Sequence, residues 1–173
     1  MKKINVTIKG ISPLLMHRFP SEPIEAIEKK SKEEQAEIAC YRTLEGELYI
    51  PGVAVTRALV NGATYSKGKG RASLQKQAAA CLFIDKEYLI LDSQKYIIDE
   101  RAVVVPATKG RIMRYRPRFD AWLVSFELHY DETLLTENQV RQIVDSTGSR
   151  VGILDFRPEH KGNCGRFVVT EWR

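Results

Sequence analysis

The sequence predicts an α+β domain built on an antiparallel sheet, with helices on one face and inserted hairpins and loops. Two observations support this. Runs in which apolar residues alternate with polar ones, typical of half-buried strands, occur at 3–10 and 122–130, and segments of helical composition are interleaved with the strand-like runs. The 173 residues fit a single domain, 1–173, with room for insertions.

The pattern of each segment determines the element expected there. Period-two alternation predicts strands, a spaced apolar stripe predicts helices, and glycine or proline marks the boundaries. The expected elements, in order, are a strand at 3–10, helical material at 23–43, a short strand at 48–50, helices at 53–62 and 74–81, strands at 81–92 and 95–105 joined by a turn at 93–94, a strand at 122–130, a helix at 137–147 and a last strand at 166–172.

Local signals at the helix ends support this assignment. Ser21 with Glu25 is near a capping pattern for the first helical segment, and Thr136 with Gln139 forms a capping box for the last helix, which Gly148 would end. A split βαβ, ferredoxin-like (RRM-like) core is the most economical arrangement of these pieces. A helical insertion near 21–46 and basic insertions near 62–76 and 106–118 would interrupt it.

The stretch 109–130 is the most informative part of the chain. Its first half is rich in arginine, and Pro117 excludes a helix there, so we expect a guanidinium-rich loop. Its second half alternates around Trp122 and Phe126 and predicts a central strand. Guanidinium groups are planar, always charged and suited to phosphates and base edges. A rigid strand that carries such a loop is therefore a candidate nucleic-acid interface.

Charge is sorted along the chain. The net charge is +5, yet 48–84 and 101–119 contain no acidic residue, and the acids are concentrated in 22–47. This distribution predicts one basic and one acidic face. Basic faces meet nucleic acid or anionic lipid, and the predominance of arginine in the second segment favours nucleic acid over a merely solvated surface.

Composition also excludes several classes. No run approaches the roughly 18 apolar residues of a membrane helix, and the alternating N-terminus is not a signal peptide, so we expect a cytoplasmic protein without a membrane partner. Cys40, Cys81 and Cys164 are widely spaced, which predicts reduced thiols. A zinc site at His160 and Cys164 would need one of the other two cysteines, and no pair has zinc-finger spacing, so no metal or cofactor is expected.

Three motifs, in order, support a family resemblance. The segment 152–158 with Gly162 and the triplet 165–167 resembles the glycine-rich loop of the RAMP superfamily, the CRISPR-associated RNA-binding subunits with ferredoxin-like folds. The segment 48–59 looks like the family's proline-glycine turn and helix, although Thr56 stands where lysine is frequent. The segment 10–14 is similar to the family's first strand and the loop after it. The chain is short for a backbone subunit, which suggests a minimal or virus-encoded relative.

The resemblance implies that the protein binds single-stranded RNA, or DNA, along its backbone, with copies of itself or other CRISPR-type subunits as partners. The predicted nucleic-acid contacts are the cations of the basic segments and of the glycine-rich loop: Arg18, Arg57, Lys67, Lys69, Arg71, Lys109, Arg111, Arg114, Arg116, Arg118, Arg150, Arg157, Lys161 and Arg166. Glycines let a main chain approach a phosphate closely, and the expected loop glycines are Gly148, Gly152, Gly162 and Gly165.

Other functions remain open. A metal-independent endoribonuclease of the same superfamily needs a histidine near a basic cluster, and His17 and His160 are the candidates. His129 lies opposite Trp122 in pleat parity, which predicts an exposed or structural role. A viral mimic that blocks CRISPR assembly would keep the fold but need not keep the basic segments, and a phage protein could bind single-stranded DNA. Because no Ser-His-Asp or paired-carboxylate signature exists, binding without catalysis is favoured.

Overall fold

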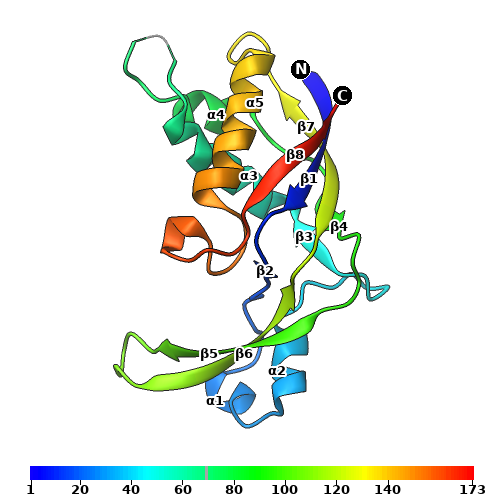
Figure 1. The fold of residues 1–173 in the computed structure, drawn as a ribbon, viewed down its shortest axis with the longest axis vertical. Helices are drawn as coiled ribbons and strands as arrows, with labels where there is room; N and C mark the ends of the chain where they lie inside the picture. Colours follow the sequence, from blue (N-terminus) through cyan, green and yellow to red (C-terminus); the bar gives the residue numbers. More distant parts are fainter. Residues whose placement is uncertain (69) are drawn as a thin grey trace.

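The structure, a computed structural model, describes residues 1–68 and 70–173. It is a mixed α/β protein with several antiparallel sheets (Figure 1). In chain order the elements are β1 (Lys2–Gly10), β2 (Leu14–Leu15), α1 (Ile24–Ile27), α2 (Lys32–Ile38), β3 (Tyr49–Pro51), α3 (Gly52–Gly62), α4 (Gln75–Cys81), β4 (Tyr88–Ile90), β5 (Ile97–Val104), β6 (Arg111–Phe119), β7 (Leu123–Tyr130), α5 (Glu137–Ser146) and β8 (Phe167–Trp172).

The central strand β1 lies between β7 and β8 and is antiparallel to both. Its register with β7 runs from Lys2 opposite Tyr130 to Lys9 opposite Leu123. The alternation of the sequence is confirmed, because the apolar residues of β1 and β7 are buried in one core with the apolar sides of α3 and α5. Figure 1 shows these helices together on one side of the sheet.

A long hairpin formed by β5 and β6 extends from the end of the molecule opposite α4 and α5 (Figure 1). The prediction of a guanidinium-rich loop at 106–118 is therefore wrong. Only the turn before Arg111 is irregular, and the residues from Arg111 onward form the strand β6. Strand β6 pairs with β5 along its length and with β2 at its end. Pro117 is accommodated within β6, where its carbonyl accepts a hydrogen bond from the Met16 N–H at 3.1 Å.

The hairpin expected around Ser93-Gln94 is also wrong. Strand β4 pairs with β3, and β5 pairs with β6. The Gln94 side chain, which was expected in a tight turn, instead forms hydrogen bonds with backbone groups, as a neighbouring strand would. It accepts from the Leu48 N–H at 2.6 Å and donates to the carbonyls of Leu48 and Leu91 at 3.2 and 2.9 Å. These bonds join the end of the β4 segment to the chain before β3.

The helical insertion consists of two short helices that pack beside the β5–β6 hairpin (Figure 1). Ser31, not Ser21, supplies the capping box, since its hydroxyl accepts from the Glu34 N–H and the Glu34 carboxylate accepts from the Ser31 N–H. The capping box of α5 at Thr136 and Gln139 is confirmed. That helix does not stop at Gly148, however, but continues as a π-helical turn over Thr147–Val151 and ends at Gly152.

No helix among the described residues is long and apolar enough to cross a membrane. The three cysteines are buried and free. Burial raises the pKa of the Cys40 thiol to about 12, which keeps it protonated and unreactive.

Candidate nucleic-acid interface

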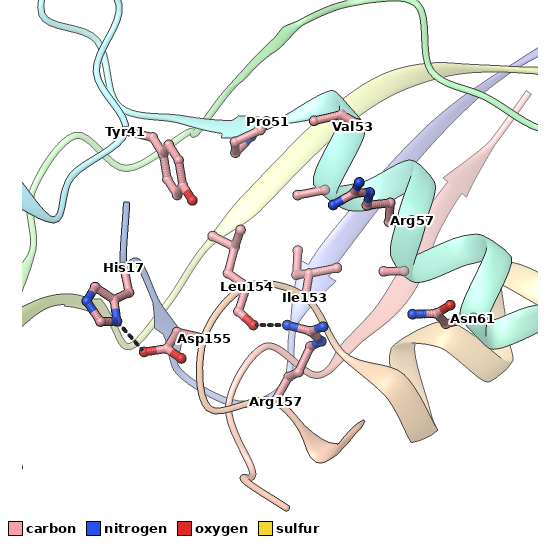
Figure 2. Close-up of a pocket in the computed structure, with 12 residues that line it drawn as sticks. His17, Tyr41, Pro51, Val53, Arg57, Asn61, Ile153, Leu154, Asp155 and Arg157 are labelled. Atoms are coloured by element: carbon pink, nitrogen blue, oxygen red, sulfur yellow. Dashed lines mark hydrogen bonds and ion pairs between the residues drawn. The ribbon is translucent and has the colours of Figure 1, made fainter. Parts of the chain in front are cut away.

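A cavity of about 670 Å³ lies between the start of α3 and the loop that follows the π-helical turn (Figure 2). It joins four segments that are separate in the sequence: the chain after β2, the segment before β3 that contains Tyr41, the helix α3 and the loop 153–157. Its lining combines cations, one carboxylate, one aromatic ring and a group of apolar side chains: His17, Tyr41, Pro51, Val53, Ala54, Arg57, Ala58, Asn61, Ile153, Leu154, Asp155 and Arg157.

Helix α3 forms one wall because the chain can turn sharply before it. A Cβ at Gly52 would overlap with the Lys86 carbonyl oxygen, so only glycine fits at the first helical position. No side chain among the described residues caps this end of the helix, and the positive end of its dipole faces the region of Pro51 and Val53. Arg57 follows one turn later and is exposed. No carboxylate of the described residues lies within ion-pair distance of Arg57.

The loop 153–157 forms the opposite wall and is conformationally strained. Leu154 and Phe156 both have left-handed backbones, with φ of 60° and 50°. Such conformations are unfavourable for residues with a side chain and occur frequently at functional sites. The loop is held by the Ile153 N–H, which donates to the Gly165 carbonyl at 3.0 Å, and by the Asp155 N–H, which donates to Leu15 at 3.1 Å. The two strained residues thus flank Asp155 and fix its direction.

Asp155 connects the cavity to the β5–β6 hairpin. Its carboxylate accepts a hydrogen bond from Arg116, and His17 Nδ1 lies 3.5 Å from Asp155 Oδ2 (Figure 2). Burial alone would raise the pKa of Asp155, but the His17 hydrogen bond and the Arg116 charge lower that pKa well below its usual range. Asp155 is therefore ionised at neutral pH, and His17 is held beside a fixed negative charge at the cavity wall.

Arg116 is 5% exposed and lies between two carboxylates. Besides Asp155, it contacts buried Asp99, whose Oδ2 is 3.5 Å from Arg116 Nη2. Arg101 Nε lies 2.9 Å from Asp99 Oδ2, and Arg118 Nη1 lies 4.0 Å from Asp99 Oδ1. The base of the hairpin therefore uses its arginines to neutralise Asp99 and Asp155, and the Arg116 guanidinium among them is not presented to solvent.

Arg157 is positioned across the cavity from α3. It is half-buried, donates to the Leu154 carbonyl at 2.8 Å and pairs with Glu159 at 2.8 Å. Glu159 also accepts from the Asn61 side chain of α3 at 2.8 Å. Figure 2 shows Arg57, Asn61 and Arg157 toward one end of the cavity and Tyr41 with His17 toward the other. The structure thus brings together Arg57 and Arg157, two predicted contacts that are 100 residues apart.

The other predicted contacts lie elsewhere. Lys109 lies in the turn of the β5–β6 hairpin and Arg111 and Arg114 on β6, whereas Lys67 and Arg71 lie in the segment before α4. Figure 1 shows the β5–β6 hairpin and α4 toward opposite ends of the molecule. Lys69 falls outside the described residues. The remaining cations are exposed or interact within the chain: Arg18 is exposed, Arg118 pairs with Asp120, Arg150 stacks over Tyr65, Lys161 is exposed and Arg166 donates to the Ser149 carbonyl.

The glycines of the C-terminal loop have an internal structural role. A Cβ at Gly148 would overlap with the Phe167 carbonyl, and one at Gly162 would overlap with Phe156. Gly152 and Gly165 have φ of 73° and 71°. These positions let the loop fold tightly on itself, and this close packing explains their glycines without a phosphate.

The remaining histidines differ in their surroundings. His129 lies on the open face of the sheet, with Nε2 2.8 Å from Glu127 and its ring 5.0 Å from that of Phe83. His160 is exposed and lies 4.0 Å from Glu159, away from the cavity lining. No cluster of three metal-ligating side chains occurs among the described residues.

Sequence reasoning missed Tyr41 and Asp155 as members of the site. Tyr41 lies in the acidic insertion, which gave no sign of a binding role. Asp155 belongs to the glycine-rich motif, and its carboxylate among the cations of that loop was the one signal in the sequence that could have marked it as a site residue. The open face of the sheet presents Lys3, Ser125 and Glu127 together with the His129 ring, against which Phe83 packs.

Comparison with known proteins gives a similarity in fold. Neither family models nor curated proteins match this sequence. The chain is similar to one in the "Cryo-EM structure of the Type III-B Cmr-beta bound to cognate target RNA", with a TM-score of 0.53 and 10% identity. The match covers 99% of this chain and 59% of that chain. At this identity the likeness concerns the fold alone.

Proposed function

We propose that this protein binds single-stranded nucleic acid, RNA in the first place, as a small RAMP-type subunit that contacts the backbone of the strand. One observation supports this best: Arg57 and Arg157 come from distant segments and line one cavity beside a helix N-terminus. Guanidinium groups and helix N-termini are common phosphate ligands. The fold resembles that of a chain from an RNA-bound complex, which agrees with this proposal.

The proposal includes a ferredoxin-like core. Strands β8, β1 and β7 are adjacent in that order, and the segment around β4 borders β7, since the Phe83 N–H donates to His129 at 3.1 Å and the Asp92 N–H to Leu123 at 3.1 Å. The chain order β1, α3, β4, β7, α5, β8 is then the βαββαβ order of such a core. The segment before α3 and the β5–β6 hairpin would be its insertions.

Titration of labelled single-stranded RNA and DNA of several lengths, at two salt concentrations, tests the function. We expect RNA binding that weakens with salt, and Arg57→Gln should weaken it and flatten the salt dependence by about 0.7 per lost phosphate contact. Lys29→Gln, which removes one charge from the acidic insertion, is the matched control and should bind like the wild type. Absence of binding to every strand would overturn the proposal, and preference for DNA would redirect it to a DNA-binding protein.

The same titration addresses assembly. If copies of the protein line up along one strand, the number of bound chains should increase with strand length. A fixed ratio of one chain to each strand would exclude that arrangement. A mimic that only blocks CRISPR assembly would bind none of the strands.

The contact between His17 and Asp155 favours a second candidate, RNA cleavage without metal. An ionised carboxylate at Nδ1 holds a proton on that nitrogen and leaves Nε2 free to accept one. Nε2 would take the proton of a 2′-OH, whose oxygen attacks the adjacent phosphorus, while the 5′-oxygen leaves and receives a proton from the imidazolium. Products with 2′,3′-cyclic phosphate and 5′-OH ends, formed in EDTA and lost in His17→Ala but kept in His160→Ala, would demonstrate it. Intact RNA would leave binding as the function.

A further inference from the structure

We infer that the cavity holds one whole nucleotide of the bound strand, with its base against Tyr41 and its phosphate at Arg57 and Arg157. The inference rests on the proposed function and specifies what this site recognises. The cavity volume of about 670 Å³ lies in the range typical of sites for small molecules and cofactors, which is more space than a pair of phosphate contacts on a flat surface requires.

The two ends of the cavity differ in chemistry. Figure 2 shows Arg57, Asn61 and Arg157 toward one end, and the Tyr41 ring with His17 toward the other. Apolar side chains, among them Leu154, lie between the two ends. A nucleotide has the same division, because its phosphate is charged and its base is flat and largely apolar on its faces. This match distinguishes a nucleotide from a bare phosphate group, which has no use for the aromatic end.

Tyr41 is well suited to hold a base. Its ring packs against that of Tyr49 with centroids 5.8 Å apart, and its carbonyl accepts from the Tyr49 N–H at 3.1 Å, so both its ring and its backbone are held by β3. Burial raises the pKa of Tyr41, and the neighbouring Tyr49 and Asp155 act in the same direction. The phenol therefore stays neutral and does not repel the nearby phosphate. A supported, neutral ring stacks on a base with little loss of side-chain freedom.

The arginine end is equally prepared. Arg157 is held in one orientation by Glu159 and by the Leu154 carbonyl, at 2.8 Å each. Arg57 projects from α3 and is exposed. One guanidinium is thus fixed before the ligand arrives, and the other is available to close on the phosphate. The loop can line the cavity in this way only because Leu154 and Phe156 adopt unfavourable left-handed backbone conformations.

Two variants separate base recognition from phosphate recognition. Tyr41→Leu keeps an apolar side chain but removes the ring, and Arg57→Gln removes the charge. Their affinities are measured for an RNA oligomer and for an oligomer of the same length that carries abasic ribose at every position. Tyr41→Leu should lower the affinity for the normal oligomer by roughly five- to a hundredfold, as expected for one stacked base, and should leave the abasic oligomer unchanged. Arg57→Gln should weaken both oligomers by a similar factor.

Tyr41→Phe guards against an effect of folding, because it retains the ring and should bind the normal oligomer within about threefold of the wild type. The inference is overturned if Tyr41→Leu weakens both oligomers equally or neither. A second arm compares adenosine 5′-monophosphate with ribose 5-phosphate. Tyr41-dependent preference for the nucleotide would support the subsite even if oligomers failed to bind, which would refute only the proposed function. Failure of the oligomers and of both small ligands would refute both.

Discussion

Replacement of Arg116 by methionine tests whether the hairpin is tied to the cavity by a buried ionic network. The Arg116 side chain is 6% exposed and lies between the carboxylates of Asp99 and Asp155. Removing one partner of a buried pair costs about 3–5 kcal/mol, because a buried charge loses its compensation. Asp99 keeps Arg101 at 2.9 Å, and Asp155 keeps His17 at 3.5 Å. We therefore expect the lower end, about 3 kcal/mol of unfolding free energy.

The measurement is unfolding by urea and, separately, by heat at neutral pH, both followed by circular dichroism. For a protein of this length, 3 kcal/mol corresponds to a fall in Tm of about 6–12 °C. Arg114→Met is the matched control, because Arg114 lies two residues earlier on β6 and on the same face, is only half-buried and has no carboxylate within ion-pair distance among the described residues. The control should change stability by less than about 1 kcal/mol, as is usual at such sites.

The acid side of the stability profile gives an independent check. The pKa of Asp155 is lowered in the folded protein, so its stabilising contribution is complete above the ordinary carboxyl pKa and is lost as the pH falls through that value toward the folded one. The wild type should therefore lose stability below about pH 5. Arg116→Met removes part of the cause of the low pKa and should show a shallower loss.

The reasoning fails if Arg116→Met unfolds within about 1 kcal/mol of the wild type, or if it loses no more than Arg114→Met. A double-mutant cycle with Asp155→Asn adds a stricter criterion. The two side chains are in contact, so the double variant should lose less than the sum of the two single losses. Additive losses would mean that the contact contributes nothing.

Two further changes test local structure. Gly165→Ala should cost more than about 3 kcal/mol, because φ is 71° and a Cβ would overlap with a backbone carbonyl. Gly46→Ala, with φ of 89° in open space, should cost only about 1 kcal/mol in the same thermal unfolding experiment, and equal losses would contradict the packing argument. Ser31→Ala should remove the capping box of α2 and cost about 1 kcal/mol, seen as faster hydrogen exchange confined to α2. Unchanged exchange there would show that packing alone holds this helix.

The sequence predicted those elements whose local pattern reflects burial on one side. Strand β1 and the strand that contains Phe126 alternate because one face of their sheet is buried. The cap at Thr136 depends on residues three apart and is therefore readable locally. Strand β6 belongs to a projecting hairpin with much less burial, so its side chains carry no apolar alternation and it was mistaken for a loop.

The candidate site was predictable only in part, for a related reason. Arg57 and Arg157 were recognisable as cations beside a helix start and in a glycine-rich loop. That they line one cavity depends on tertiary structure. Arg116 shows the opposite case: in the sequence it is one arginine of a basic run, yet in the fold it is buried and paired with a carboxylate 39 residues later. The composition does not distinguish an exposed arginine such as Arg57 from a buried, ion-paired one such as Arg116, and only the fold shows the difference.

This separation makes the salt dependence of binding diagnostic of the surface that the strand contacts. Each neutralised phosphate on a single strand contributes about 0.7 to the slope of log affinity against log salt. Contacts from Arg57 and Arg157 alone predict a slope of about 1.4, whereas engagement of Lys109, Arg111 and Arg114 on the hairpin would raise it to about 3.5. Replacing those three hairpin cations by glutamine should lower the slope only in the second case. If the slope stays steep after this triple change, neither the cavity nor the hairpin accounts for the phosphate contacts. The cations of the loop before α4 would then be the next to replace.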